Sequence, residues 1–171
     1  MKKRPDTKRI TMDAVLTAIA LVIFIVELQF PEILPVPGVK LGLANVITLI
    51  AMFQLGPVDA LAILLGRILL GGMFSGRIIS ILYSLAGGLL CYAVTLVLRK
   101  AVSKSQIWVC GVLGAIAHNA GQILTAVAIT QTPELFGYFP ILMVSGLLTG
   151  AFTGGIATFT VKKTQKLWEL N

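Results

Sequence analysis

The sequence predicts an all-α integral membrane protein with six transmembrane helices, and three observations support this. First, 57% of the 171 residues are hydrophobic and only 12% are charged, which excludes a separate soluble domain. Second, the apolar residues form six long segments. Third, the basic residues gather in short stretches between or beside those segments. We therefore expect one membrane domain over residues 1–171, with basic ends at residues 1–12 and 162–171.

The first three apolar segments cover residues 14–30, 41–55 and 58–74. No small-residue cleavage site follows the first, so we expect it to stay in the mature protein. The second and third are short for a span of about 20 residues, and they are compatible with one re-entrant hairpin. We favour two true spans, because the charges then fall on consistent sides of the membrane.

The remaining segments cover residues 78–98, 107–130 and 139–161. With six crossings, eleven of the fourteen lysines and arginines lie on one side, in residues 1–9, 99–104 and 162–166. The positive-inside rule makes that side the cytoplasm, so both termini are expected there. The protein itself is expected in the cell membrane. The net charge of +7 is thus a topology signal, and we expect no nucleic-acid partner.

Three basic residues fall outside those stretches: Lys40, Arg67 and Arg77. Lys40 and Arg77 open the second and fourth spans at the outer face. Arg67 lies about ten residues into the third span, roughly 15 Å from its inner end, so it is expected near mid-membrane. An arginine at that depth is costly unless it faces a partner, water or a ligand.

Polar side chains converge on the same level of the membrane. His118 and Gln122 lie four residues apart on one helical face, with Asn119 beside them, and Asn45 lies near the outer end of the second span. These residues indicate a pocket for an anionic ligand that opens to the outside. Two alternatives stay open: hydrogen bonds that only join neighbouring helices, and an ion pair of Glu27 with Arg67 or Arg77.

Small residues indicate helix contacts. Ala14 and Ala18 form a step on the first span that is a plausible groove for another membrane subunit, whereas Gly146, Gly150 and Gly154 favour packing inside the protein over dimerisation. Both cysteines lie in apolar segments and are expected to act as small hydrophobic residues. No Cys/His metal spacing is present, and we expect no metal or cofactor.

Three motifs resemble a known family: P-G-V-K-L-G-L-A-N at residues 37–45, S-L-A-G-G at 84–88 and G-A-I-A-H-N-A-G-Q at 114–122. They are similar to those of the Gx transporter family, also called heptaprenyl diphosphate synthase component I. That family is grouped with the S components of energy-coupling-factor transporters. The resemblance implies an S-component-like bundle that captures a vitamin or precursor outside and docks, through Ala14 and Ala18, on a transmembrane T subunit with two ATPases.

The enzyme name conflicts with the acidic residues. Prenyl diphosphate synthesis uses clustered aspartates to hold magnesium, but Asp6, Asp13 and Asp59 are the only aspartates and none are adjacent. No Walker A motif is present either, so ATP hydrolysis would need another subunit. We expect a non-catalytic protein without cofactor.

The sequence thus favours a substrate-binding subunit for a small anionic or amphipathic ligand, such as a vitamin, flavin, quinone precursor or isoprenoid. The alternative is a membrane partner of a soluble prenyl synthase or of a quinone- or flavin-linked redox system. The candidate binding residues are Lys40, Asn45, Arg67, Arg77, His118, Asn119 and Gln122.

Overall fold

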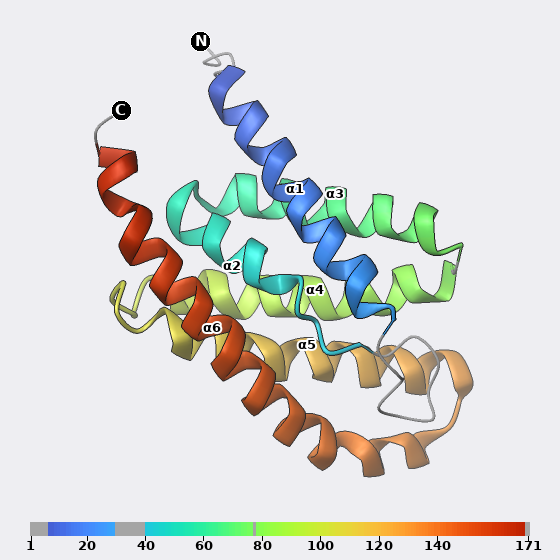
Figure 1. Cartoon of the computed structure of the whole chain (residues 1–171). Helices are drawn as coiled ribbons and strands as arrows, with labels where there is room; N and C mark the ends of the chain where they lie inside the picture. The colour runs from blue at the N-terminus through green and yellow to red at the C-terminus, as the bar shows by residue number, and fades with distance from the viewer. Residues whose placement is uncertain (1–6, 30–39, 77, 170–171) are drawn as a thin grey trace.

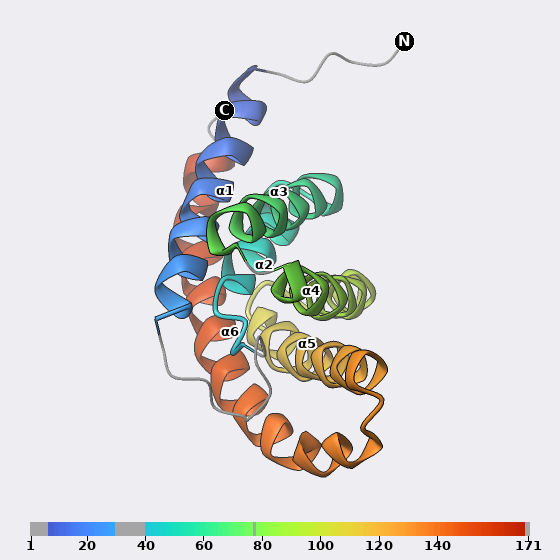
Figure 2. The ribbon, with the colours of Figure 1, turned by 90° about the vertical axis from the view of Figure 1, so that its right-hand side faces the viewer.

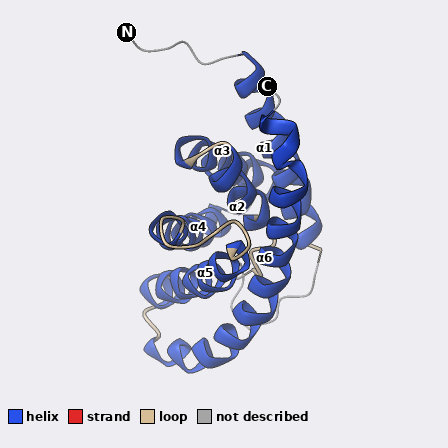
Figure 3. Ribbon diagram, turned by 90° about the vertical axis from the view of Figure 1, so that its left-hand side faces the viewer, coloured by secondary structure: helices blue, strands red, loops and turns tan. Residues whose placement is uncertain are grey.

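A computed structural model describes residues 7–29, 40–76 and 78–169 (Figure 1). This part of the chain is entirely helical apart from its connections (Figure 3). The elements are α1 (Thr7–Glu27), α2 (Asn45–Gln54), α3 (Pro57–Ser75), α4 (Ile78–Leu98), α5 (Ile107–Thr130), the 3₁₀ helix η1 (Pro133–Tyr138) and α6 (Phe139–Glu169). The all-α prediction is confirmed, and the six α-helices follow the six apolar segments. The sequence did not predict η1.

The helices form a layer with two covering helices. The helices α3, α4 and α5 lie side by side, and α1 and α6 cross them on one face (Figures 1 and 2). The short helix α2 lies in the middle and contacts each of the other five α-helices. Its residues 46–52 are all buried, so α2 forms the centre of the apolar core.

Five of the helices are long and apolar enough to cross a membrane, and α2 is not one of them. With 10 residues, α2 is roughly 15 Å long, against about 30 Å for the hydrocarbon core of a bilayer. The expected second span, residues 41–55, is therefore helical only in its second part. Residues 40–44, which we call the nonhelical segment, precede it.

The nonhelical segment and α2 together connect the two ends of the bundle. The Lys40 side chain bonds Ser80 near the start of α4, whereas Gln54 at the end of α2 bonds Thr164 near the end of α6. Irregular backbone is tolerated at membrane depth only where protein or a cavity surrounds it. The nonhelical segment is surrounded in this way, since residues of α1, α4 and α5 bond it.

One end of the bundle, which we call the basic end, is held by polar contacts between helices. Arg9 Nε donates to Asp59 Oδ1 at 3.0 Å, Arg9 also bonds the Leu55 carbonyl, and Tyr92 Oη donates to the Pro57 carbonyl at 3.0 Å. Asp59 lies in the first turn of α3, where a negative charge is favourable, and its carboxylate also forms an ion pair with Arg9. Basic residues from α1, the α4–α5 connection and α6 gather at this end, which agrees with the predicted clustering of charge.

The glycines of α6 pack inside the protein, as the sequence favoured. A Cβ on Gly150 would lie 2.6 Å from Cα of Val112, and one on Gly154 would lie 2.7 Å from Cα of Trp108. Only glycine allows α5 and α6 to approach this closely. Ala14 and Ala18 differ, because neither is buried against the rest of the protein on α1.

Candidate functional site

The site begins where the nonhelical segment turns into α2. Gly42 has a φ of +77°, a conformation that side chains with a Cβ rarely adopt, and its carbonyl accepts a bond from the Asn45 backbone N–H at 3.0 Å. The backbone N–H of Gly42 donates to the carboxylate of Glu27, which is only 5% exposed. Glu27 thus anchors this turn to the end of α1.

Asn45, the first residue of α2, joins α3 to α5. Its Oδ1 accepts a hydrogen bond from Arg67 Nη2 at 3.1 Å, and its Nδ2 lies 3.1 Å from His118 Nδ1. An amide nitrogen can only donate, so His118 Nδ1 is the acceptor in this bond. A neutral His118 ring then carries its proton on Nε2.

Gln122, one turn later on α5, accepts a hydrogen bond from the Nε2–H of His118. In the amide orientation that satisfies both of its ends, Gln122 Oε1 lies 3.1 Å from His118 Nε2 and 3.2 Å from the backbone nitrogen of Lys40. Its Nε2 then donates to the Lys40 carbonyl at 2.9 Å. A continuous chain of hydrogen bonds therefore runs from Arg67 through Asn45, His118 and Gln122 to the Lys40 backbone. We call it the relay.

Two cations of the site share one aromatic ring. Lys40 Nζ lies 4.0 Å from the centre of the Phe24 ring and donates to Ser80 Oγ at 2.6 Å, and Arg67 Cζ lies 5.9 Å from the same ring centre. Such contacts stabilise a cation that has lost its water. Phe24 on α1 thus brings the two positive charges of α3 and the nonhelical segment to one place.

Arg67 is buried without a carboxylate partner in the part of the chain that the structure describes. The residue is 2% exposed, and its Nε has no hydrogen-bond partner there. Among the described residues the ion-pair distance is met only between Arg9 and Asp59. Glu27 makes no direct ion pair with Arg67, because it bonds the turn at Gly42, although its charge still acts on Arg67 at longer range. The alternative pairing of Glu27 with Arg77 lies outside the described residues.

The predicted residues divide into three groups. Lys40, Asn45, Arg67, His118 and Gln122 come together in the relay, as expected. Asn119 does not join them: its Nδ2 donates to the Leu142 carbonyl on α6 at 2.7 Å, so it links α5 to α6. Arg77 lies outside the described residues.

Two glycines make room for the His118 ring. A Cβ on Gly42 would lie 2.8 Å from His118 Cδ2, and a Cβ on Gly87 would lie 2.8 Å from His118 Nδ1. Neither glycine was predicted as a site residue, nor were Phe24 and Ser80. Gly42 and Gly87 both fall within the motifs that carry the family resemblance, which is the one signal that singled them out.

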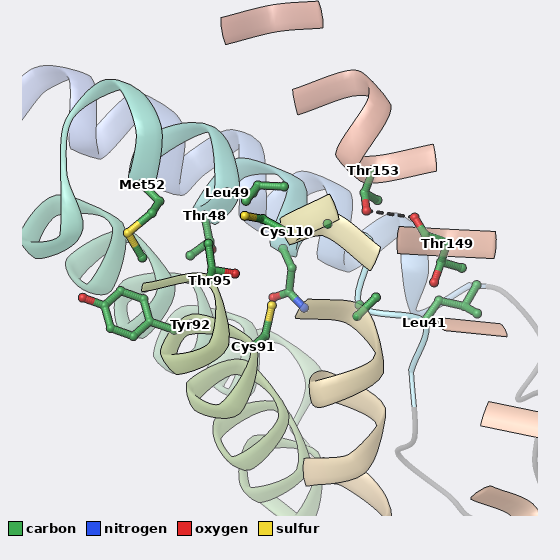
Figure 4. A pocket seen from close by; sticks show the side chains of 14 residues that line it. Leu41, Thr48, Leu49, Met52, Cys91, Tyr92, Thr95, Cys110, Thr149 and Thr153 are labelled. Atoms are coloured by element: carbon green, nitrogen blue, oxygen red, sulfur yellow. Dashed lines mark hydrogen bonds between the residues drawn. The ribbon is translucent and has the colours of Figure 1, made fainter. Parts of the chain in front are cut away.

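A cavity adjoins the relay on the side of α2. It is lined from α2, α4, α5 and α6, with Asn45 in its wall, and its volume is about 20 Å³ (Figure 4). That volume accommodates about one water molecule. The relay residues bond one another, so this conformation is a closed one in which protein groups satisfy the polar atoms of the relay apart from Arg67 Nε.

Comparison with known families identifies the chain. The model of the family described as heptaprenyl diphosphate synthase component I matches residues 16–160. The chain belongs to this family. The match runs from α1 into α6. Every relay residue therefore lies within the part of the chain that matches the heptaprenyl diphosphate synthase component I family. No curated protein and no solved structure matched the chain.

Proposed function

We propose that this membrane protein is the substrate-capturing subunit of an uptake transporter of the energy-coupling-factor type. Its ligand is a small anionic or amphipathic molecule, of the vitamin, flavin, quinone-precursor or isoprenoid kind. The observation that supports this most is Arg67, whose guanidinium is buried and bonds a neutral amide, with its Nε unpartnered among the described residues. A buried cation is costly without a negative partner, and an anionic ligand supplies one.

The surroundings of Arg67 support the same reading. Lys40 places a second cation against the Phe24 ring, and the amides of Asn45 and Gln122 are suited to orient a ligand. In many transporters the substrate site is formed where a transmembrane helix is interrupted, at the N-terminus of the remaining half-helix. The N-terminus of the short helix α2, preceded by the nonhelical segment, is similar to the start of such a half-helix.

Ligand entry requires the closed conformation to open. The Lys40 backbone bonds Gln122, and the adjoining cavity holds about one water molecule, so a ligand must replace bonds that the nonhelical segment now makes. The positive-inside rule places the basic end in the cytoplasm. The ligand then enters from the opposite end of the bundle, from outside the cell.

In this proposal the chain is not an enzyme and works with partners. A transmembrane T subunit with its ATPases supplies the energy, and Ala14 and Ala18 offer a small-residue step on α1. Such steps let two helices approach closely. The location is the cell membrane, with both termini in the cytoplasm.

The family description favours a second candidate. A non-catalytic membrane partner of a polyprenyl diphosphate synthase would bind an isoprenoid diphosphate through the same cations, and a partner of a quinone- or flavin-linked redox system would use the same membrane fold. The diphosphate is an anion that Arg67 and Lys40 are suited to hold. The identity of the bound ligand separates the candidates.

The deciding experiment is mass spectrometry of small molecules that co-purify in mild detergent. Wild type is compared with Arg67→Gln, and Arg99→Gln serves as the control, because Arg99 contacts Met52 at the basic end, away from the relay. The melting temperature of each variant is measured alongside, so that loss of fold is not read as loss of binding.

An anionic vitamin-like, flavin or quinone-precursor molecule that is present in wild type and Arg99→Gln but absent in folded Arg67→Gln supports substrate capture. A prenyl diphosphate with that pattern favours the synthase partner. Equal recovery of bulk lipid alone from all three proteins contradicts both. If Arg67→Gln does not fold, Arg67→Lys keeps the charge but not the planar fork, and should bind more weakly.

A further inference from the structure

The cavity beside the relay has a wall rich in hydroxyl groups. Its polar lining includes Thr48 from α2, Thr95 from α4, and Thr149 and Thr153 from α6, and these side chains surround the same space in Figure 4. Asn45 lines the cavity as well, so the cavity and the relay share a residue. We propose that this cavity is a binding site for one water molecule, held by Thr48, beside the relay.

Thr48 behaves differently from most helical threonines in the described part of the chain. Its Oγ1 is buried, it has no hydrogen-bond partner among the described residues, and the residue is 6% exposed. Threonines in helices usually donate their hydroxyl to the carbonyl four residues earlier. Threonines elsewhere in the described helices do so: Thr11, Thr17, Thr125, Thr130, Thr149, Thr153, Thr158 and Thr164. The Thr48 hydroxyl is therefore available to the cavity.

The size and chemistry of the cavity match one water molecule. A water site needs about 10 to 15 Å³ of such volume and two to four polar partners, and this cavity has about 20 Å³. Thr48 can donate and accept. Thr149 and Thr153 give their protons to α6 carbonyls at 2.9 and 2.8 Å, which leaves their oxygens as acceptors.

A metal cation fits this site poorly. The lining contains no carboxylate among the described residues, and the Asn45 oxygen that would coordinate a cation already accepts from Arg67. Hard cations prefer several oxygen ligands with negative charge among them. A neutral water meets the same hydroxyl groups without repulsion from the nearby guanidinium.

The direction in which one substitution changes the melting temperature tests the proposal. Thr48→Val replaces the hydroxyl by a methyl group of similar size. A buried hydroxyl without any partner destabilises a protein, so its removal from a dry cavity would leave the melting temperature unchanged or raise it. Removal of the hydroxyl that holds a water should instead lower the melting temperature by about 2 to 4 °C. Thr158→Val is the control, because its hydroxyl bonds the Gly154 carbonyl at 2.7 Å and does not line the cavity.

The expected result is a melting temperature of Thr48→Val below that of wild type in the same detergent, with Thr158→Val measuring what the loss of an ordinary helical hydroxyl does. A Thr48→Val melting temperature equal to or above that of wild type overturns the water site. A high-resolution structure of the wild type gives a second test that does not depend on the variant folding: density within hydrogen-bond distance of Thr48 Oγ1 is expected, and a clear lack of it overturns the proposal. Replacing sodium by choline should leave the wild-type melting temperature unchanged, and a sodium-dependent rise would assign the cavity to a cation instead.

Discussion

Asn45 Nδ2 donates to His118 Nδ1 across 3.1 Å, and this bond joins the first residue of α2 to the middle of α5. On its other side Asn45 accepts from Arg67 of α3. Both ends of one short amide are thus used by groups from other helices. Because α2 begins at Asn45, the relay positions the start of the short central helix.

The second apolar segment, residues 41–55, is helical only from Asn45 to Gln54, and backbone contacts account for its nonhelical start. In a helix that began at residue 41, the N–H groups of the first turn, including that of Gly42, would have no partner within the helix. The structure instead gives the Gly42 N–H to Glu27 and the Lys40 backbone to Gln122. Side chains from α1 and α5 therefore satisfy the backbone that leaves the helix, as membrane proteins require.

Gly42→Ala should destabilise the protein by about 1 to 3 kcal/mol, because its Cβ would meet His118 and its φ of +77° is unfavourable. Gly76→Ala is a matched control: its φ is +63°, but nothing lies within 4 Å of the added Cβ. The difference between the two melting temperatures isolates the contacts of the added Cβ with His118 and Asn45. Equal losses would show that the ring is not confined at Gly42.

Gly150→Ala should lower the melting temperature, since its Cβ would lie 2.6 Å from the Val112 backbone. Gly155→Ala should leave it unchanged or raise it by a few degrees, because that position faces open space and alanine favours helix by about 1 kcal/mol. Size-exclusion chromatography checks the alternative of dimerisation. A change of oligomeric state in Gly150→Ala without a loss of stability would contradict internal packing.

The helices could largely be predicted because length and apolar composition determine them directly. The fourth and fifth apolar segments coincide with α4 and α5. The spacing of His118 and Gln122 also placed both on one face of α5, where the relay uses them. Asn119 follows His118 by one residue, which turns it about 100° away and toward α6.

Other features left no signal in the sequence pattern. Phe24 is one apolar residue in an apolar helix, and only the fold brings its ring beside Lys40 and Arg67. An ion pair of Glu27 with Arg67 or Arg77 was one open alternative, but the partner that the structure gives it is a backbone N–H, which every residue except proline carries. The shortening of α2 likewise depends on contacts that form only in the folded protein.

The topology is tested by labelling single cysteines in a variant without Cys91 and Cys110. Lys104 lies in the α4–α5 connection at the basic end, and Glu134 lies in η1 at the opposite end, and both are exposed. If the basic end is cytoplasmic, a membrane-impermeant maleimide should label Glu134→Cys in intact cells and Lys104→Cys only after lysis. The reverse pattern would place the proposed ligand site on the cytoplasmic side.

Asn45→Asp tests whether the positive charge of Arg67 binds the anionic ligand. The introduced carboxylate would lie where Asn45 Oδ1 now accepts from Arg67 Nη2 at 3.1 Å, and so would supply the negative partner that Arg67 lacks among the described residues. The carboxylate cannot donate to His118 Nδ1 as the Asn45 amide does, so we expect the variant to fold with a melting temperature near or somewhat below that of wild type. Its affinity for the co-purifying anion should fall about tenfold or more, which corresponds to about 1.4 kcal/mol.

The matched control is Asp59→Asn, which removes the carboxylate of the Arg9 ion pair at the basic end and leaves the relay intact. Affinity in this control should stay at the wild-type value. If Asn45→Asp folds and binds the anion as tightly as wild type, Arg67 does not carry the binding. The buried Arg67 would then serve only to hold α2 and α3 together, because the new carboxylate would have neutralised its charge without lowering the affinity for the anion.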